Sequence, residues 1–244
     1  MLKPRRRVAL DRACADAVRG FESRTGYRFG DPELICWALT HRSYLNSNGT
    51  DLPGSNERLE FLGDAVLELV VNEHLYRCYA NHQEGELTKT KSLLVSRNVL
   101  AGRARLLGLG RFMLLSDAER ESGGDDRASI LADGFEAVIG AIYLDGGLEA
   151  ARGFVTDYLL AHTEAILREP DHVNYKSILQ EHVQDTIKTY PRYNTLSEDG
   201  PDHEKVFCVE VLVKKDRLGL GEGTTKKQAE QAAAQDALGK LGMV

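Results

Sequence analysis

The order of apolar and polar positions divides the chain into two parts. From about residue 9 to residue 167, apolar residues recur at helical spacing, and polar or Gly-rich breaks separate the runs. No alternating strand pattern of any length occurs in this part. The pattern therefore predicts an all-α domain of about seven helices.

The pattern changes after a short polar hinge. Residues 174–188 predict one amphipathic helix, and residues 206–213 are rich in the β-branched and aromatic side chains typical of a strand. The last helix would be capped by Thr224 or Thr225 and followed by Gly242. The predicted order is α-β-β-β-α, a small α+β domain with a three-stranded antiparallel sheet.

Length and composition agree with this division. The chain has 244 residues, of which 42% are hydrophobic and 28% charged, as in an ordinary globular protein of two modest domains. We expect the domains at residues 8–167 and 174–243, joined by a linker at residues 168–173.

Several features indicate a cytoplasmic protein. No run of about 18 apolar residues exists, so the sequence predicts no membrane span. The basic N-terminus reaches no apolar segment, which argues against a secretory signal. The cysteines form no C-x-x-C pair, so we expect reduced thiols and no zinc site. They are Cys14, Cys36, Cys78 and Cys208.

The net charge gives an ambiguous indication about partners. A charge of -6 counts, at face value, against a nucleic-acid partner. Binding to a phosphate backbone depends on a local basic patch, however, and not on the average charge of the chain. Whether the chain can bind nucleic acid therefore depends on how its charges are distributed.

Three acids lie on one stripe of a predicted helix in the segment SNERLEFLGDAV. Glu57, Glu60 and Asp64 stand at i, i+3 and i+7, where like charges repel. Gly63 interrupts the same helix at a cost of about 1 kcal/mol relative to Ala. A solvated face is the simple explanation for such a stripe, and for Glu57 alone we favour it.

A second predicted helix makes a purely solvated stripe less satisfactory. Asp133 and Glu136 stand at i, i+3 in the segment SILADGFEAVIGAIYL, which is otherwise almost wholly apolar and therefore buried. Buried acids require a partner or a metal, and no Lys or Arg lies within the segment. If the two helices meet, Glu60 and Asp64 would join these acids around a hard cation such as Mg²⁺ or Mn²⁺. A further acid, Glu84, lies in the loop HQEGEL that we expect after the first helix.

Four segments resemble the ribonuclease III family, in the order of that family. NERLEFLGDAV resembles its signature, and ALTHRSY, EGELTKTKS and ILADGFEAVIGAIYLD resemble its other blocks. The α-β-β-β-α segment is similar to a double-stranded-RNA-binding domain. Together the similarity leaves only about the first twenty residues uncovered.

The resemblance implies an all-α endonuclease domain that cuts double-stranded RNA as a homodimer. Each cut would leave a 5′-phosphate and a 3′-hydroxyl, and paired cuts a two-nucleotide 3′ overhang. By resemblance, the metal ligands are Glu60, Asp64, Asp133 and Glu136, with Mg²⁺ as the ion and Mn²⁺ as a substitute. By the same resemblance, the catalytic acids are Asp64, Glu136, Glu57 and Glu84.

Two other residues of these blocks receive different roles. By resemblance, Phe61 contributes to the dimer contact, although a core aromatic is an alternative. His41 could suggest acid–base catalysis, but the family gives it no such role, and we expect a structural histidine.

Positive charges gather at the start of the last predicted helix. Lys226 and Lys227 stand next to free backbone N–H groups, where lysines are unfavourable unless an anion binds. The preceding Gly221 and Gly223 would let the backbone approach it closely. By resemblance, the two lysines contact phosphates, and other residues reach the minor grooves of the duplex. These residues are Ser177, Gln180, Glu181 and, in the loop around residues 201–203, His203.

Two other classes of function remain to be weighed. A non-cleaving protein that binds or folds double-stranded RNA would use the acids only structurally, although it has little reason to keep charges on a buried helix. A hydrolase of small phosphates would leave the C-terminal domain unexplained. Ribosomal precursor RNA is the substrate that the family implies, and no residue of the sequence selects it.

Overall fold

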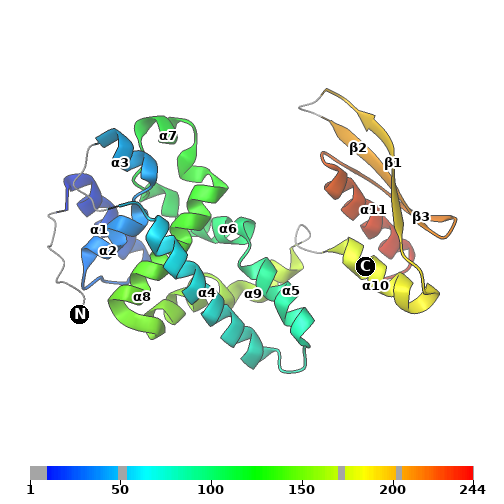
Figure 1. Cartoon of the computed structure of the whole chain (residues 1–244), viewed down its shortest axis with the longest axis horizontal. Helices are drawn as coiled ribbons and strands as arrows, with labels where there is room; N and C mark the ends of the chain where they lie inside the picture. Colours follow the sequence, from blue (N-terminus) through cyan, green and yellow to red (C-terminus); the bar gives the residue numbers. More distant parts are fainter. Residues whose placement is uncertain (1–9, 49–53, 170–173, 202–204, 244) are drawn as a thin grey trace. The chain divides into compact units, whose positions relative to one another are not determined.

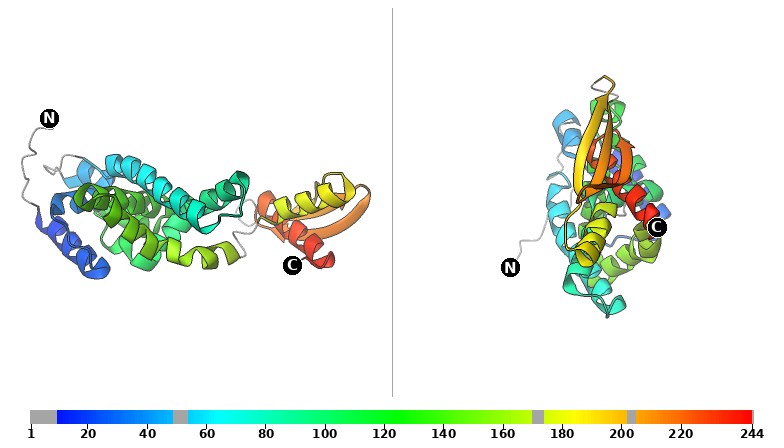
Figure 2. Two further views of the ribbon diagram at one scale, coloured as in Figure 1. Left: turned by 90° about the horizontal axis from the view of Figure 1, so that it is seen from below. Right: turned by 90° about the vertical axis from the view of Figure 1, so that its right-hand side faces the viewer.

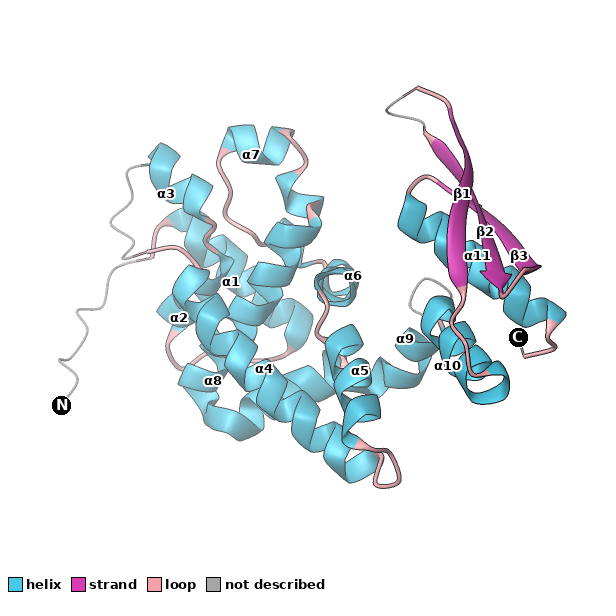
Figure 3. Ribbon diagram, turned by 45° about the vertical axis from the view of Figure 1, so that its right-hand side comes forward, coloured by secondary structure: helices cyan, strands magenta, loops and turns pink. Residues whose placement is uncertain are grey.

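The computed structural model describes residues 10–48, 54–169, 174–201 and 205–243 of the chain. The chain forms two compact units, Met1–Glu169 and Pro170–Val244. The boundary between the units falls within the linker expected at residues 168–173. Among the described residues, helices make up the first unit and the strands belong to the second (Figure 3). The predicted fold class, an all-α domain followed by a small α+β domain, is confirmed.

The first unit contains nine described α-helices (Figure 1). Short 3-10 turns at Leu109–Arg111, Gly124–Asp126 and Leu160–His162 separate some of them. The helices are α1 (Arg12–Thr25), α2 (Pro32–Leu39), α3 (Arg42–Asn48), α4 (Glu57–Cys78), α5 (Glu84–Leu94), α6 (Arg97–Leu107), α7 (Asp117–Glu121), α8 (Ala128–Tyr158) and α9 (Thr163–Arg168).

The long helix α8 is the centre of this unit. It is apolar on nearly every side and packs against α2, α4 and α6. Phe135 and Ile139 of α8 and Leu67 of α4 are fully buried in the shared core. The prediction that Asp133 and Glu136 lie on a buried helix is therefore confirmed. Both side chains are only partly exposed.

The second unit has the predicted order α-β-β-β-α. It comprises α10 (Tyr175–Ile187), β1 (Arg192–Asp199), β2 (Val206–Val213), β3 (Asp216–Gly223) and α11 (Lys226–Lys240), and the strands form an antiparallel sheet in the order β1-β2-β3. Figure 2 shows α10 and α11 on one side of this sheet. The Thr225 hydroxyl accepts a hydrogen bond from the N–H of Gln228, so the predicted cap of the last helix is correct.

The glycines of β3 have a packing role that was not expected from the sequence. A Cβ atom at Gly221 would lie 2.1 Å from the backbone nitrogen of Ala233, and one at Gly223 would lie 2.6 Å from that of Ala229. Both glycines therefore allow α11 to pack directly on β3. The expectation that they let the backbone approach an anion stays a prediction.

Two of the four cysteines lie together in the helical unit. Cys14 of α1 and Cys36 of α2 lie against each other, with their Cα atoms 5.6 Å apart and both side chains fully buried. Helix packing brings the two cysteines together across the chain, which their spacing does not reveal. Cys78 and Cys208 are free. Within the described residues, no helix is both long enough and apolar enough to span a bilayer.

Candidate functional site

Two glycines determine how closely α4 approaches α8. A Cβ atom at Gly63 would lie 1.7 Å from the carbonyl oxygen of Glu136, and one at Gly140 would lie 2.3 Å from that of Leu59. Only hydrogen fits at either position, so the two backbones are in direct contact. The loss of helix propensity at Gly63 is the cost of this contact. The contact between the two backbones brings the acid stripe of α4 next to the acids of α8.

The acids of α4 and α8 influence one another electrostatically. Burial, followed by the charges of Asp64, Glu60 and Asp133, raises the pKa of Glu136 to about 8. The pKa of Glu60 is raised by burial and then by Asp133, Glu57 and Asp64. Burial also raises the pKa of Asp133. The structure thus gathers the four predicted metal ligands, with Glu57, in one region.

Arginines from other helices face this acid cluster. Arg97, the first residue of α6, lowers the pKa of Glu60, Asp133 and Glu136 and so opposes the raising effects. Sequence reasoning missed Arg97 because it lies on a separate helix, and no local pattern marks it. Without a further cation, the mutual repulsion of the acids is only partly compensated.

The donor set of the cluster fits a hard divalent cation. Its side chains offer carboxylate oxygens, which Mg²⁺ and Mn²⁺ prefer, and their repulsion falls when a cation binds between them. Among the described residues, however, no three His, Cys, Asp or Glu side chains are already arranged to hold an ion.

Glu57 lies at the edge of the cluster. It is exposed, accepts a hydrogen bond of 2.8 Å from the Ser55 hydroxyl, and has an oxygen 3.9 Å from a guanidinium nitrogen of Arg42. These contacts hold the carboxylate at the edge, on the side of α3.

Glu84 is separate from the cluster within one chain. It begins α5, where a loop was expected, and it accepts a hydrogen bond of 2.9 Å from the Thr88 hydroxyl. It is not among the charges that shift the pKa of Glu60, Asp133 or Glu136. The ion pair of Lys91 with Glu68, 2.8 Å long, connects α5 to α4.

His41 has the contacts of a structural residue. Its Nδ1 lies 2.9 Å from the Ser43 hydroxyl, and burial is the main cause that lowers its pKa. A neutral imidazole held in this way agrees with the expectation from the sequence.

Phe61 does not pack in the core of its own chain. Its side chain is 81% exposed, which removes the alternative of a core aromatic. On the same helix, towards α5, lies a cavity of about 410 Å³ with a mainly apolar lining. The lining includes Leu69, Leu75, Tyr76, Glu84 and Leu87.

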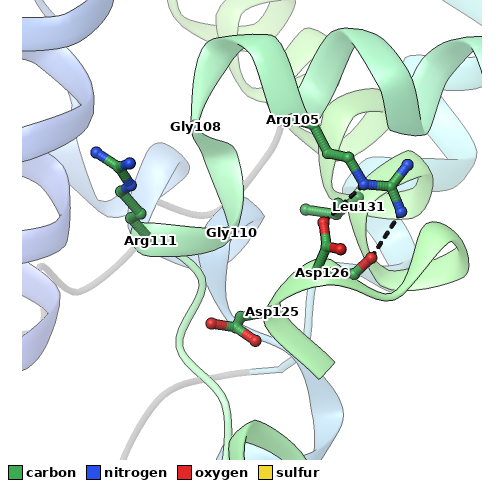
Figure 4. A pocket seen from close by; sticks show the side chains of 7 residues that line it. All are labelled: Arg105, Gly108, Gly110, Arg111, Asp125, Asp126 and Leu131. Atoms are coloured by element: carbon green, nitrogen blue, oxygen red, sulfur yellow. Dashed lines mark hydrogen bonds and ion pairs between the residues drawn. The ribbon is translucent and has the colours of Figure 1, made fainter. Parts of the chain in front are cut away.

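A polar pocket near the 3-10 turns is separate from the acid cluster (Figure 4). Arg105 donates hydrogen bonds of 2.6 and 2.7 Å to the carboxylate and the backbone carbonyl of Asp126. Arg111 points away from the two aspartates of the pocket. A Cβ atom at Gly110 would lie 1.9 Å from the carbonyl oxygen of Asp125. Two segments of backbone are therefore in direct contact at this pocket.

The predicted RNA contacts of the second unit lie on α10 and α11. Gln180 and Glu181 are exposed on α10, and Ser177 in its first turn is partly exposed. Lys226 and Lys227 are the first two residues of α11, and both are exposed. His203 lies outside the described residues.

Lys226 forms an ion pair with another residue of its unit. Its Nζ donates to a carboxylate oxygen of Glu198 on β1 at 2.7 Å. Lys227 forms no ion pair with any residue that the structure describes. Sequence reasoning missed Glu198 because this residue lies on a strand, β1, that is far from α11 along the chain.

Comparison with known families gives matches for both units. A family model described as Ribonuclease-III-like matches residues 31–163, and a model described as Double-stranded RNA binding motif matches residues 175–241. Each match falls within one of the two units.

Curated relatives and solved structures agree. A protein named Ribonuclease 3 from Protochlamydia amoebophila is 44% identical over 220 residues, which cover 90% of each chain. One with the same name from Symbiobacterium thermophilum is 47% identical over 225 residues, or 92% of each chain. The nuclease domain of ribonuclease III from Campylobacter jejuni is similar in structure, with a TM-score of 0.53 and 42% identity over 62% of this chain and 96% of that one. A second structure of that domain has the same TM-score and identity, and the similarity covers 58% of this chain and 94% of that one. It is described as showing structural flexibility in a region involved in dimer formation.

The acid cluster, the α-β-β-β-α unit and these similarities point to the same conclusion. The chain belongs to the ribonuclease III family, as an endoribonuclease with a double-stranded-RNA-binding domain.

Proposed function

We propose that the chain hydrolyses phosphodiester bonds of duplex RNA with Mg²⁺, or with Mn²⁺ as a substitute. The observation that carries the proposal is the meeting of acids from two helices in a partly buried cluster. Glu60 and Asp64 of α4 and Asp133 and Glu136 of α8 are the ligands that we assign to the ion. Burial and then the charges of Asp64, Glu60 and Asp133 raise the pKa of Glu136 to about 8, and this supports the assignment because a bound cation would stabilise the ionised carboxylate.

The side chains of the cluster have separate tasks in the reaction. A bound Mg²⁺ supplies a water of lowered pKa and positive charge for the phosphoryl oxygens. Burial of Glu136 between apolar neighbours limits the access of bulk water and keeps its carboxylate in place. Glu57, held by Ser55, is available at the edge to accept a proton from water. We assign 5′-phosphate and 3′-hydroxyl ends to the products.

We assign a homodimer in which the α4 helices of two copies meet. Phe61 is a large apolar side chain at 81% exposure, and the apolar cavity between α4 and α5 offers a place for it on a second copy. A twofold axis would make this contact twice. The relative from Campylobacter jejuni, with its region involved in dimer formation, supports this assignment.

The same arrangement gives a role to Glu84. Glu84 lines the cavity that would receive Phe61 of a second copy, and Phe61 directly follows Glu60 in the chain. Dimerisation would therefore bring Glu84 of the partner subunit towards the acid cluster. Two such sites on one duplex would cut both strands and leave the two-nucleotide 3′ overhang.

The second unit would hold the duplex by its shape. Ser177, Gln180 and Glu181 of α10 are assigned to one minor groove, His203 to the next, and the lysines at the start of α11 to the phosphates between them. Structured transcripts, ribosomal precursor RNA among them, are the substrates that fit such recognition. A cytoplasmic location fits these substrates.

A cleavage assay tests the proposal. An end-labelled, perfectly paired RNA duplex is incubated with the purified chain in Mg²⁺, in Mn²⁺ and in EDTA, and the product ends are mapped. We expect metal-dependent cuts with 5′-phosphates and two-nucleotide 3′ overhangs. Glu136→Gln should reduce the rate by orders of magnitude while the duplex still binds. Binding without cutting in either metal would instead favour a non-cleaving RNA-binding protein.

A further inference from the structure

An acidic side chain lies among the lysines of the RNA-binding unit. A carboxylate oxygen of Glu198, in β1, accepts a hydrogen bond from Lys226 Nζ at 2.7 Å. The other carboxylate oxygen lies 3.8 Å from Lys205 Nζ. The hydrogen bond from Lys226 is the main cause that lowers the pKa of Glu198, so this carboxyl is ionised at neutral pH. One negative charge thus contacts two positive ones.

The sheet register produces this contact. Glu198 of β1, Phe207 of β2 and Gly223 of β3 are neighbours in one row across the three strands. α11 begins just after Gly223, so Lys226 can extend back over the row, with its Nζ 5.6 Å from the centre of the Phe207 ring. The Lys226 side chain therefore lies over the Phe207 ring and ends at the Glu198 carboxylate.

The position of Glu198 makes the contact relevant to RNA. Glu198 lies just before the β1–β2 loop, to which the minor-groove contact is assigned, and it reaches the N-terminus of α11, to which the phosphate contact is assigned. The adjacent Lys227 is exposed and forms no ion pair with any described residue. The two lysines at the start of the helix thus differ in the charge that they offer to a phosphate.

We propose that Glu198 limits the affinity of this unit for duplex RNA by competing with phosphate for Lys226. The proposal rests on the duplex-RNA binding assigned above. A phosphate that approaches Lys226 must share this lysine with the carboxylate or displace it. The charge that Lys226 contributes to binding is therefore smaller than that of a free lysine.

The substitution Glu198→Gln isolates the charge, because an amide oxygen can still accept a hydrogen bond from Lys226. We expect Glu198→Gln to tighten duplex binding by about two- to fivefold, the range typical of one exposed ion pair. The dependence of log K on log salt concentration should steepen by up to about 0.9, the value for one additional phosphate neutralised.

The measurement uses the full chain and a fluorescein-labelled, perfectly paired RNA duplex of about 20 base pairs, long enough to span the roughly 16 base pairs that such a domain covers. EDTA prevents cleavage, and fluorescence anisotropy is followed at several salt concentrations. Asp216→Asn is the matched control. It removes one negative charge at the exposed start of β3, from a residue that forms no ion pair with any described residue. We expect this control to leave affinity and salt dependence unchanged.

A double variant tests whether the effect passes through Lys226. In the Lys226→Ala background, Glu198→Gln should have little remaining effect on affinity. An equal gain with and without Lys226, or an equal gain from Asp216→Asn, would show a general charge effect and overturn the proposal. Unchanged or weaker binding by Glu198→Gln would mean that Glu198 only orients Lys226. If the unaltered chain binds no duplex, the proposed function itself fails. This outcome differs from failure of the Glu198 proposal, in which the unaltered chain binds the duplex but the variants do not behave as expected.

Discussion

The contact between α4 and α8 allows a sharp test at Gly63. In Gly63→Ala, the new Cβ would lie 1.7 Å from the carbonyl oxygen of Glu136 and 3.0 Å from the backbone nitrogen of Gly140. An ordinary carbon–oxygen contact is about 3.3 Å, so the two helices must separate by roughly 1.6 Å at this point. Both obstacles are backbone atoms, and no side chain can turn to relieve the clash.

Two opposing contributions determine the sign of the effect. Alanine has a helix propensity about 1 kcal/mol better than that of glycine, which favours the variant. Overpacking in a rigid core typically costs about 1–3 kcal/mol, and a gap of 0.5–1 Å already loses a quarter to a half of the dispersion energy of the contact. Since both backbones must move, we expect a cost of about 3 kcal/mol or more and a net loss of about 2 kcal/mol.

Urea denaturation followed by tryptophan fluorescence measures this loss. Trp37 is the single tryptophan of the chain and lies in α2, so its signal reports the helical unit alone. The matched control is Gly102→Ala in α6, where a new Cβ meets nothing within 4 Å. This control should gain about 1 kcal/mol from helix propensity.

The result would also appear in catalysis. Separation of the helices displaces Glu60 and Asp64 from Asp133 and Glu136, and a misplacement of about 1 Å can cost roughly 100-fold in rate. Equal stabilisation by Gly63→Ala and Gly102→Ala, with cleavage unchanged, would refute the argument that backbone contact positions the acids.

Three other predictions concern the acid cluster, the dimer and the RNA contacts. In EDTA, the pKa of Glu136 is about 8 in the native protein and near 4.5 in the unfolded chain. Between these pH values the native state binds the proton and the unfolded state does not, so the free energy of unfolding should fall as pH rises. Glu136→Gln should remove that part of the fall, and denaturation curves that stay parallel to those of the unaltered chain across this pH range would contradict the prediction. Phe61→Asp should convert the dimer to a monomer in light scattering, while Leu106→Asp, at a side chain 66% exposed on α6, should not. Lys227→Ala should weaken binding to any duplex sequence more than Lys226→Ala, because Lys226 is already ion-paired, and a loss confined to some sequences would refute both contacts.

Local features of the fold were predictable from the sequence. The capping threonine Thr225 and the helical run around Asp133 depend on neighbours within a few residues, where periodicity and capping chemistry act. The strand at residues 206–213 agrees with the observed β2 for the same reason. The acid stripe of α4 also follows from spacing along one helix.

Tertiary structure decided which of these features meet. The sequence by itself determined the division into two units, the order of elements in the second unit and the residue types that could bind a cation, because propensity and periodicity are local properties of the chain. It could not show that the cost at Gly63 allows contact with Glu136, that Arg97 faces the acids, or that Glu198 neutralises Lys226. These contacts join residues far apart in the chain, and only the packing of the core and the register of the sheet bring them together.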